Sequence, residues 1–170
     1  MQSNRNSSNL QNEAGFTLIE LLIVMSIILI LATLAIPAMQ KTIKKANETS
    51  AVQSLKTLNT QEAVYNSTFP THGYSCTLAA LGGKSGAGAP TAEAAQLISE
   101  DLASGNKSGY SFGVTNCTKV TVNNQDQITS YTLTAVPNTV GKTGDRGYCT
   151  DGNEVRYDPK GGTNCTELLQ

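Results

Sequence analysis

Gly15-Phe16-Thr17-Leu18-Ile19-Glu20 stands directly before a long apolar run, and this junction decides the fold of the N-terminal part of the chain. The next twenty residues, Leu21 to Gln40, contain no charged side chain. A helix of that length is about 30 Å long, which is the thickness of the hydrocarbon core of a membrane. Glu20 lies at the edge of this run, where a lone carboxylate is costly unless another group pairs with it. The junction therefore predicts a membrane-spanning helix with a functional glutamate at its start.

The stretch from Gly15 to Val24, GFTLIELLIV, resembles the processing signature of type IV pilins and type II secretion pseudopilins. The resemblance implies that a prepilin peptidase cuts between Gly15 and Phe16 and methylates the new amine of Phe16. Glu20 then becomes the fifth mature residue, where this superfamily keeps a glutamate. Pro37 becomes the twenty-second, where the superfamily often keeps a helix-kinking proline. The resemblance also implies that Glu20 of one subunit pairs with the Phe16 amine of another during assembly.

An ordinary secretory signal peptide is the alternative, because small residues such as Ala35 and Ala38 could mimic a cleavage site. The apolar run is longer than the roughly 7–15 residues typical of such signals, and Glu20 lies at its start. The leader, residues 1–15, departs from the superfamily because Arg5 is its only basic residue. We expect this departure to affect the efficiency of cleavage more than its occurrence.

Charge and cysteine content disagree about the orientation of the chain. Lys41, Lys44 and Lys45 follow the apolar run, and the positive-inside rule would place them in the cytoplasm. Four cysteines lie beyond the run and favour an oxidising compartment instead. We follow the cysteines and the resemblance. The chain is expected to cross the bacterial inner membrane once, with a cytoplasmic N-terminus, and then to enter a periplasmic or cell-surface filament.

The cysteines predict two disulfides rather than a zinc site. None of them forms a C-x-x-C pair, and His72 is the only histidine. Three connectivities are possible, of which we favour Cys149 with Cys165 and Cys76 with Cys117. Free buried thiols are the alternative.

One long helix is predicted over residues 16–67, with 16–40 as its transmembrane or filament-core part. The first half is apolar on all sides, and Pro37 predicts a kink within residues 33–37. The second half is amphipathic. Its apolar positions, expected to pack against a sheet, are Val52, Leu55, Leu58 and Tyr65, with Glu62 in the same series. Its polar positions, expected to stay in solvent, are Lys44, Lys45, Glu48 and Lys56.

Residues 68–170 are predicted to form a globular head, which makes the fold class α+β: a long helix packed on an antiparallel sheet of three to five strands. Runs rich in β-branched and aromatic residues predict the strands. They are residues 110–115, 119–122, 129–136, 147–150 and 154–157. A helical turn at 78–81 and a short helix at 91–102 are expected before the strands.

Composition and motifs do not favour an enzyme or a nucleic-acid binder. With 12 Lys+Arg against 13 Asp+Glu there is no basic footprint for nucleic acid. No nucleophile motif accompanies His72, so we predict no catalytic residue and no cofactor. Asp145, Asp151 and Asp158 could supply oxygen ligands for Ca²⁺. The resemblance is consistent with this, because some major pseudopilins bind calcium near this end of the chain. Their spacing does not match an EF-hand, and ordinary turn chemistry is the favoured interpretation.

These observations predict a structural subunit of a type IV pilus or related filament that polymerises through its N-terminal helix. A major-pseudopilin-like subunit of a type II secretion system is the close alternative. A single-pass, membrane-anchored binding domain that never polymerises is the alternative from another class. The expected partners are further copies of the chain, a prepilin peptidase, an inner-membrane assembly platform and, before assembly, membrane lipid.

Overall fold

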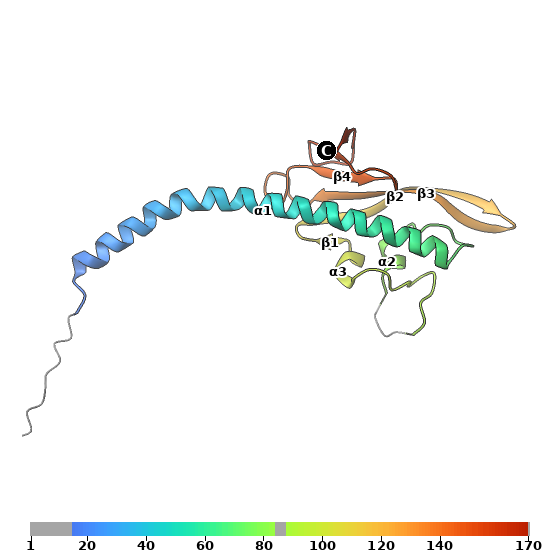
Figure 1. Cartoon of the computed structure of the whole chain (residues 1–170), viewed down its shortest axis with the longest axis horizontal. Helices are drawn as coiled ribbons and strands as arrows, with labels where there is room; N and C mark the ends of the chain where they lie inside the picture. Colours follow the sequence, from blue (N-terminus) through green and yellow to red (C-terminus); the bar gives the residue numbers. More distant parts are fainter. Residues whose placement is uncertain (1–14, 84–87, 170) are drawn as a thin grey trace, which may run out of the picture. The chain divides into compact units, whose positions relative to one another are not determined.

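The computed structural model describes residues 15–83 and 88–169, apart from the side chains of Leu34 and Pro37. The chain divides into two compact units, Met1–Met39 and Gln40–Gln170. Helix α1 (Leu18–Thr68) runs through both, and every other helix and strand belongs to the second unit, which we call the head (Figure 1). The bounds of α1 lie within two residues of the predicted helix.

The described part of the first unit is a helix whose apolar side chains have no cover. The exposed fractions of its large apolar residues from Leu18 to Leu31 range from 47% at Val24 to 83% at Leu18. No polar face interrupts this surface, so amphipathic packing on a soluble core does not account for it.

The helical assignment continues through Pro37, but the side chain of this proline lies outside the described residues, so the kink stays a prediction. Among the described residues, no single helix meets the length and hydropathy requirements for crossing a membrane. The segments Leu18–Thr33 and Ala38–Thr68 meet them only together, as a bent pair.

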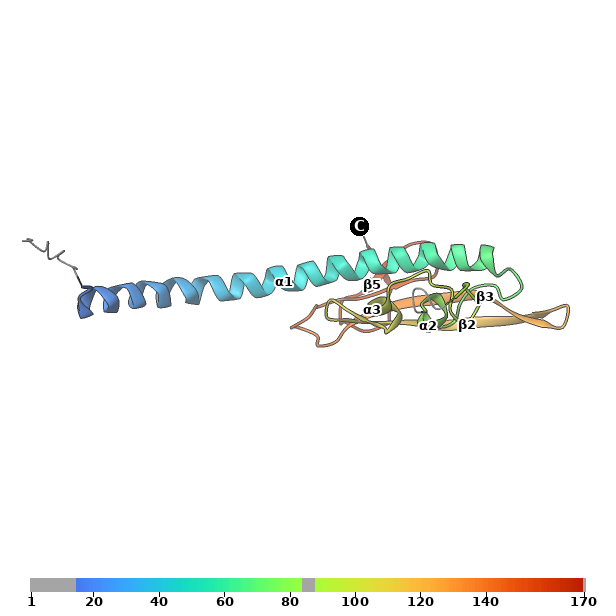
Figure 2. The same ribbon diagram turned by 90° about the horizontal axis from the view of Figure 1, so that it is seen from below.

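Within the head, the second half of α1 lies along the sheet (Figures 1 and 2). Its buried positions recur at steps of three and four residues, which places them on one face of the helix. They include Glu48, Ala51, Leu55, Leu58, Glu62 and Tyr65. We call these six residues the buried stripe. Val52, which we expected among them, is only partly buried at the edge of the core.

Glu48 corrects a prediction, because we expected it in solvent and it is 6% exposed. Its Oε2 accepts a hydrogen bond from the Arg146 guanidinium at 2.8 Å, and its Oε1 accepts one from the Asp145 N–H at 3.1 Å. Burial alone would raise the pKa of Glu48, but these two donors outweigh it and hold the pKa below its ordinary value. Arg146 is far away in sequence, so the helical pattern alone could not identify this partner.

The head contains one antiparallel sheet in which each strand pairs with the next along the chain. The strands are β1 (Asn106–Lys107), β2 (Tyr110–Val122), β3 (Gln125–Pro137), β4 (Gly147–Thr150), β5 (Arg156–Asp158) and β6 (Glu167–Leu168). The α+β class is therefore confirmed, but the sheet has six strands rather than three to five. The added strands β1 and β6 have two residues each, too few to show an alternating pattern.

Strands β2 and β3 form the long hairpin that dominates the sheet. We predicted two strands here, but the structure has the single strand β2. The pairing of β2 with β3 shifts register between Thr115 and Thr118, and such a shift bends a strand without ending it. The hairpin turns at Asn123 and Asn124, whose φ values of 50° and 64° are positive. Two-residue hairpin turns of type I′ require positive φ at both central residues, and asparagine adopts such values readily.

Of the two predicted short helices, the first is confirmed and the second is mostly wrong. Helix α2 (Leu78–Leu81) has Thr77 as its N-cap, but α3 covers only Glu100–Ala103. Residues 91–99 instead bond to the α2 segment, for example from the Ala95 N–H to the Ala80 carbonyl at 2.8 Å. These tertiary hydrogen bonds replace the helical ones.

The core lies between the buried stripe and the sheet. The largest fully buried apolar side chains come from α1, from the end of α2 and from three strands: Leu55, Leu58, Leu81, Tyr110, Leu133 and Tyr148. Burying each leucine contributes about 1.5–3 kcal/mol.

Two disulfides tie loops to this core. The structure pairs Cys76 with Cys117 and Cys149 with Cys165, with a Cα–Cα distance of 6.0 Å in each. This is the connectivity that we favoured among the three possible ones. The first bond joins the segment after α1 to β2, and the second joins β4 to the loop before β6.

Replacing Cys76 and Cys117 together by serine is expected to lower the free energy of unfolding of the head by about 4 kcal/mol, because the unfolded chain regains the freedom of a loop of 41 residues. The double-serine variant of Cys149 and Cys165 should lose about 3 kcal/mol, because its loop has 16 residues. Urea unfolding followed by circular dichroism measures both. A larger loss for the second variant would contradict the prediction.

Candidate processing and assembly site

The Gly15–Phe16 bond lies before α1, in a stretch without regular secondary structure. Phe16 is 87% exposed, and a Cβ added at Gly15 would meet no atom within 4 Å. Nothing in the described part of the chain itself therefore demands glycine at this position. If glycine is required there, the requirement comes from a molecule that binds this bond.

Thr17 and Glu20 form a reciprocal pair at the start of α1. The Glu20 Oε2 accepts hydrogen bonds from the Thr17 N–H at 2.9 Å and from its hydroxyl at 2.7 Å. In return, the Glu20 N–H donates to the Thr17 Oγ1 at 3.2 Å. This is a capping box, which satisfies backbone N–H groups that a helix start leaves without partners. It also holds the Glu20 side chain against Thr17, the residue after Phe16.

The second carboxylate oxygen of Glu20 remains open. All hydrogen bonds to this carboxylate end on Oε2, and no described residue donates to Oε1. Between Gly15 and Gln40 the sequence contains no lysine, arginine or histidine. No side chain of this segment can therefore supply a cation for Glu20.

Lys44 and Asp145 form an ion pair across the head, at 2.8 Å between Nζ and Oδ2. Lys44 is one of the three lysines that suggested a cytoplasmic position. Its partner is a residue of the head itself, so this charge is used in holding the loop before β4 to α1.

The three candidate calcium ligands lie in separate hydrogen-bond networks. Asp145 binds Lys44, and Asp151 Oδ1 accepts from the Asn153 N–H at 3.3 Å. Asp158 accepts from the Lys160 N–H at 2.9 Å and from the Asn164 N–H at 3.2 Å, one bond on each oxygen. The described residues contain no group of three acidic, histidine or cysteine side chains placed to hold a metal ion.

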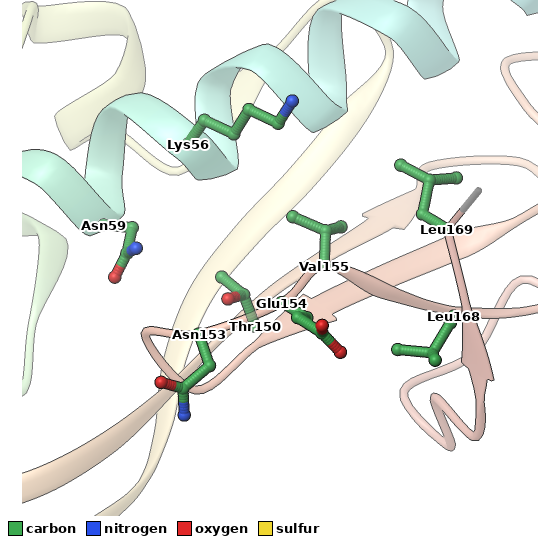
Figure 3. A pocket seen from close by; sticks show the side chains of 8 residues that line it. All are labelled: Lys56, Asn59, Thr150, Asn153, Glu154, Val155, Leu168 and Leu169. Atoms are coloured by element: carbon green, nitrogen blue, oxygen red, sulfur yellow. The ribbon is translucent and has the colours of Figure 1, made fainter.

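An open groove of about 410 Å³ lies between α1 and the C-terminal strands (Figure 3). Its lining consists of Lys56, Asn59, Thr150, Asn153, Glu154, Val155, Leu168 and Leu169. Asn59 is already engaged, because it donates to the Gly152 carbonyl and accepts from the Tyr131 hydroxyl. No histidine or cysteine is among these lining residues, and the His72 ring is hydrogen-bonded to the neighbouring Thr71 hydroxyl. The groove therefore offers no recognisable nucleophile with a base.

Residues 10–36 match the family model described as the prokaryotic N-terminal methylation motif. This motif is the hallmark of type IV pilin and pseudopilin prepilins, and the chain contains it. No curated protein and no solved structure matches it. The matched segment includes Gly15, Phe16 and Glu20, and it ends before Pro37. The motif does not distinguish a pilus subunit from a secretion pseudopilin.

Thr17 is a residue of this helix start that we did not predict. The signal was present, because threonine three residues before glutamate at the start of an apolar run is typical of a capping box. We had assigned Glu20 only an intermolecular role, whereas the structure gives it a local one as well.

Replacing Thr17 by valine is expected to destabilise the first turn of α1 by about 1 kcal/mol, because the Glu20 N–H loses its acceptor. Amide exchange over residues 18–21 in detergent micelles should then be about fivefold faster. Ser26→Ala is the matched control, because the Ser26 hydroxyl binds only the Leu22 carbonyl. Equal exchange in Thr17→Val and wild type would show that the capping box contributes nothing.

Proposed function

We propose that the mature chain begins at a methylated Phe16 and polymerises through α1 as a structural subunit of a type IV pilus or related filament. The observation that carries this proposal is the Glu20 carboxylate, which is fixed by Thr17 and has an open Oε1 at the start of an uncovered apolar helix. Cleavage before Phe16 creates an α-amine, and this amine of a neighbouring subunit is the cation that Glu20 lacks.

Electrostatics favours this pairing in an apolar layer. A carboxylate and an ammonium are each costly there when alone, and much less so when they meet in a hydrogen-bonded pair. A subunit in lipid that meets the growing end would neutralise both charges at once. The pairing would also set the axial position of one helix against the next.

The exposed apolar surface of α1 supports helix-to-helix assembly as the end state. Large apolar residues cover all sides of the helix from Leu18 to Leu31. Lipid covers them before assembly, and neighbouring helices would cover them in a filament core. Ser26, Ala32 and Ala35 are small enough to let helices approach closely.

Among the alternatives, the calcium-binding kind of secretion pseudopilin has less support. The candidate ligands Asp145, Asp151 and Asp158 accept hydrogen bonds from donors of the chain itself. We therefore place the subunit in a pilus-type filament, delivered from the inner membrane, with the head outside. Its partners would be a prepilin peptidase, an assembly platform and further copies of itself.

Mass spectrometry of the chain from native membranes tests the processing step. We expect a mature N-terminus at Phe16 with one added methyl group, because the Gly15–Phe16 bond is exposed and lies within the matched motif. A start near residues 36–39 would indicate an ordinary secreted protein. An intact Met1 would indicate a membrane-anchored domain.

Replacing Glu20 by glutamine is expected to abolish filaments, with at least a tenfold loss of sheared fibre, while cleavage continues. Glutamine keeps the acceptor for the Thr17 hydrogen bonds but removes the charge that would pair with an amine. Thr17→Val makes the opposite change, because it weakens the capping box and leaves the charge. Electron microscopy and immunoblotting of sheared fibres measure both, with exposed Glu93→Gln as the control. Normal filaments from Glu20→Gln would refute charge pairing.

A further inference from the structure

The buried stripe of α1 contains a second glutamate, Glu62, whose environment differs from that of Glu48. Its exposed fraction is 0%. Oε2 accepts one hydrogen bond, from the Ser75 N–H at 2.8 Å, and Oε1 has no partner. None of the ion pairs among the described residues includes it. A buried carboxylate with one hydrogen bond and no cation is a costly arrangement.

The titratable groups that face Glu62 cannot donate a hydrogen bond to its unpartnered Oε1. The titratable neighbours are Tyr65 on α1 and Tyr131 on β3, whose pKa values are raised chiefly by burial and next by the charge of Glu62. The Tyr65 hydroxyl donates to the Ala92 carbonyl at 2.8 Å, and the Tyr131 hydroxyl donates to Asn59 Oδ1 at 2.7 Å. Each tyrosine has one hydroxyl proton, so neither can also donate to Oε1.

The charges beyond these tyrosines add to the same effect. Glu93 lies near Tyr65, while Asp151 and Tyr74 lie near Tyr131, and each raises the pKa of the tyrosine that it faces. Among the described residues, no cation is a cause of the shifted pKa of Glu62. A proton from solvent is therefore the simplest way to neutralise this site.

Burial raises the pKa of Glu62 from its ordinary 4.5 to about 7, against a smaller lowering by the Ser75 N–H. The charged form is thus the costly one throughout the acidic range.

We propose that Glu62 is a proton-binding site that controls how firmly residues 69–77 are held on the head. The segment leaves the end of α1 and carries the Ser75 N–H that binds Glu62. When Glu62 loses its proton, the buried carboxylate is stabilised by hydration. Water reaches it where the protein segment packed over Glu62 opens most easily.

Residues 69–77 lie against Glu62 through the Ser75 N–H, and they contain no helix or strand of their own. We therefore take this segment as the weakest part of the protein layer over Glu62. Besides the bond to Glu62, two backbone hydrogen bonds link them to β3. These run from the Tyr74 N–H to the Ile128 carbonyl and from the Ile128 N–H to the His72 carbonyl, both at 2.9 Å. The disulfide of Cys76 with Cys117 limits how far the segment can move. Ionisation therefore loosens the segment without releasing it from β2.

The direction of the pH effect follows from proton binding. Between about pH 4.5 and pH 7 the folded head keeps the Glu62 proton and the unfolded chain has lost it, so stability falls as pH rises through this window. The corresponding change in the opening or unfolding equilibrium is on the order of 100-fold. Below the window both states are protonated, and above it neither is.

The test is hydrogen exchange of the full chain in detergent micelles, read by mass spectrometry on peptides covering residues 69–77 from pH 5 to pH 8. After correction for intrinsic rates, we expect the protection of this segment to fall at least tenfold as pH rises. In Glu62→Gln, a neutral side chain at every pH, protection should stay constant. The same pH dependence in wild type and Glu62→Gln, or a flat wild-type profile, would overturn the proposal.

Two further measurements test the proposal even if Glu62→Gln does not fold. Glu100→Gln changes an exposed carboxylate of the same head and should leave the wild-type profile intact. Carboxyl ¹³C NMR of the wild-type chain reads Glu62 directly, and a midpoint near pH 7 is expected. A midpoint below pH 5 would overturn the proposal even if Glu62→Gln does not fold. All these readouts are independent of whether the chain polymerises.

Discussion

The contact between the buried stripe of α1 and the sheet is the interaction on which the rest of the head depends. Leu55 and Leu58 are fully buried against a sheet that contributes Tyr110, Leu133 and Tyr148. The sheet is a simple meander with short edge strands, and α1 covers one of its faces (Figure 2). The loops and both disulfides are attached around this layer, so their positions follow from it.

The buried stripe contains two glutamates with opposite environments, because Glu48 has a cationic partner and Glu62 has none among the described residues. Glu48 is paired with Arg146, and the pKa of Glu48 is lowered. The Arg146 guanidinium also lies 5.1 Å from the ring centre of Tyr157. The contribution of Glu48 to stability is present above its unfolded pKa and is lost as pH falls. Glu62 has no cation and contributes with the opposite sign. One helix thus combines a carboxylate that is ion-paired with a carboxyl group that has no cation.

In the first unit, the constraint on α1 is different, because its apolar surface has no partner among the described residues. Glu20 begins this surface, where Thr17 fixes one of its oxygens and leaves the other open. In the proposed filament, the outward-facing apolar residues and the Glu20 carboxylate would meet a second copy of the same helix that begins with a free amine. The prepilin motif and the geometry of the helix start therefore lead to the same interpretation.

Much of the fold could be predicted because its signals are local. The apolar run, the periodicity of α1 and the Gly15-to-Glu20 motif all depend on neighbours within a few residues. Sequence missed what depends on distant contacts: the irregular path of residues 91–99, the two shortest strands and the partner of Glu48. By itself, the sequence determined that one long helix begins at an apolar junction with a glutamate. Only the tertiary structure decided which of its buried carboxyls meets an arginine and which remains unpaired, because those partners come from segments far along the chain.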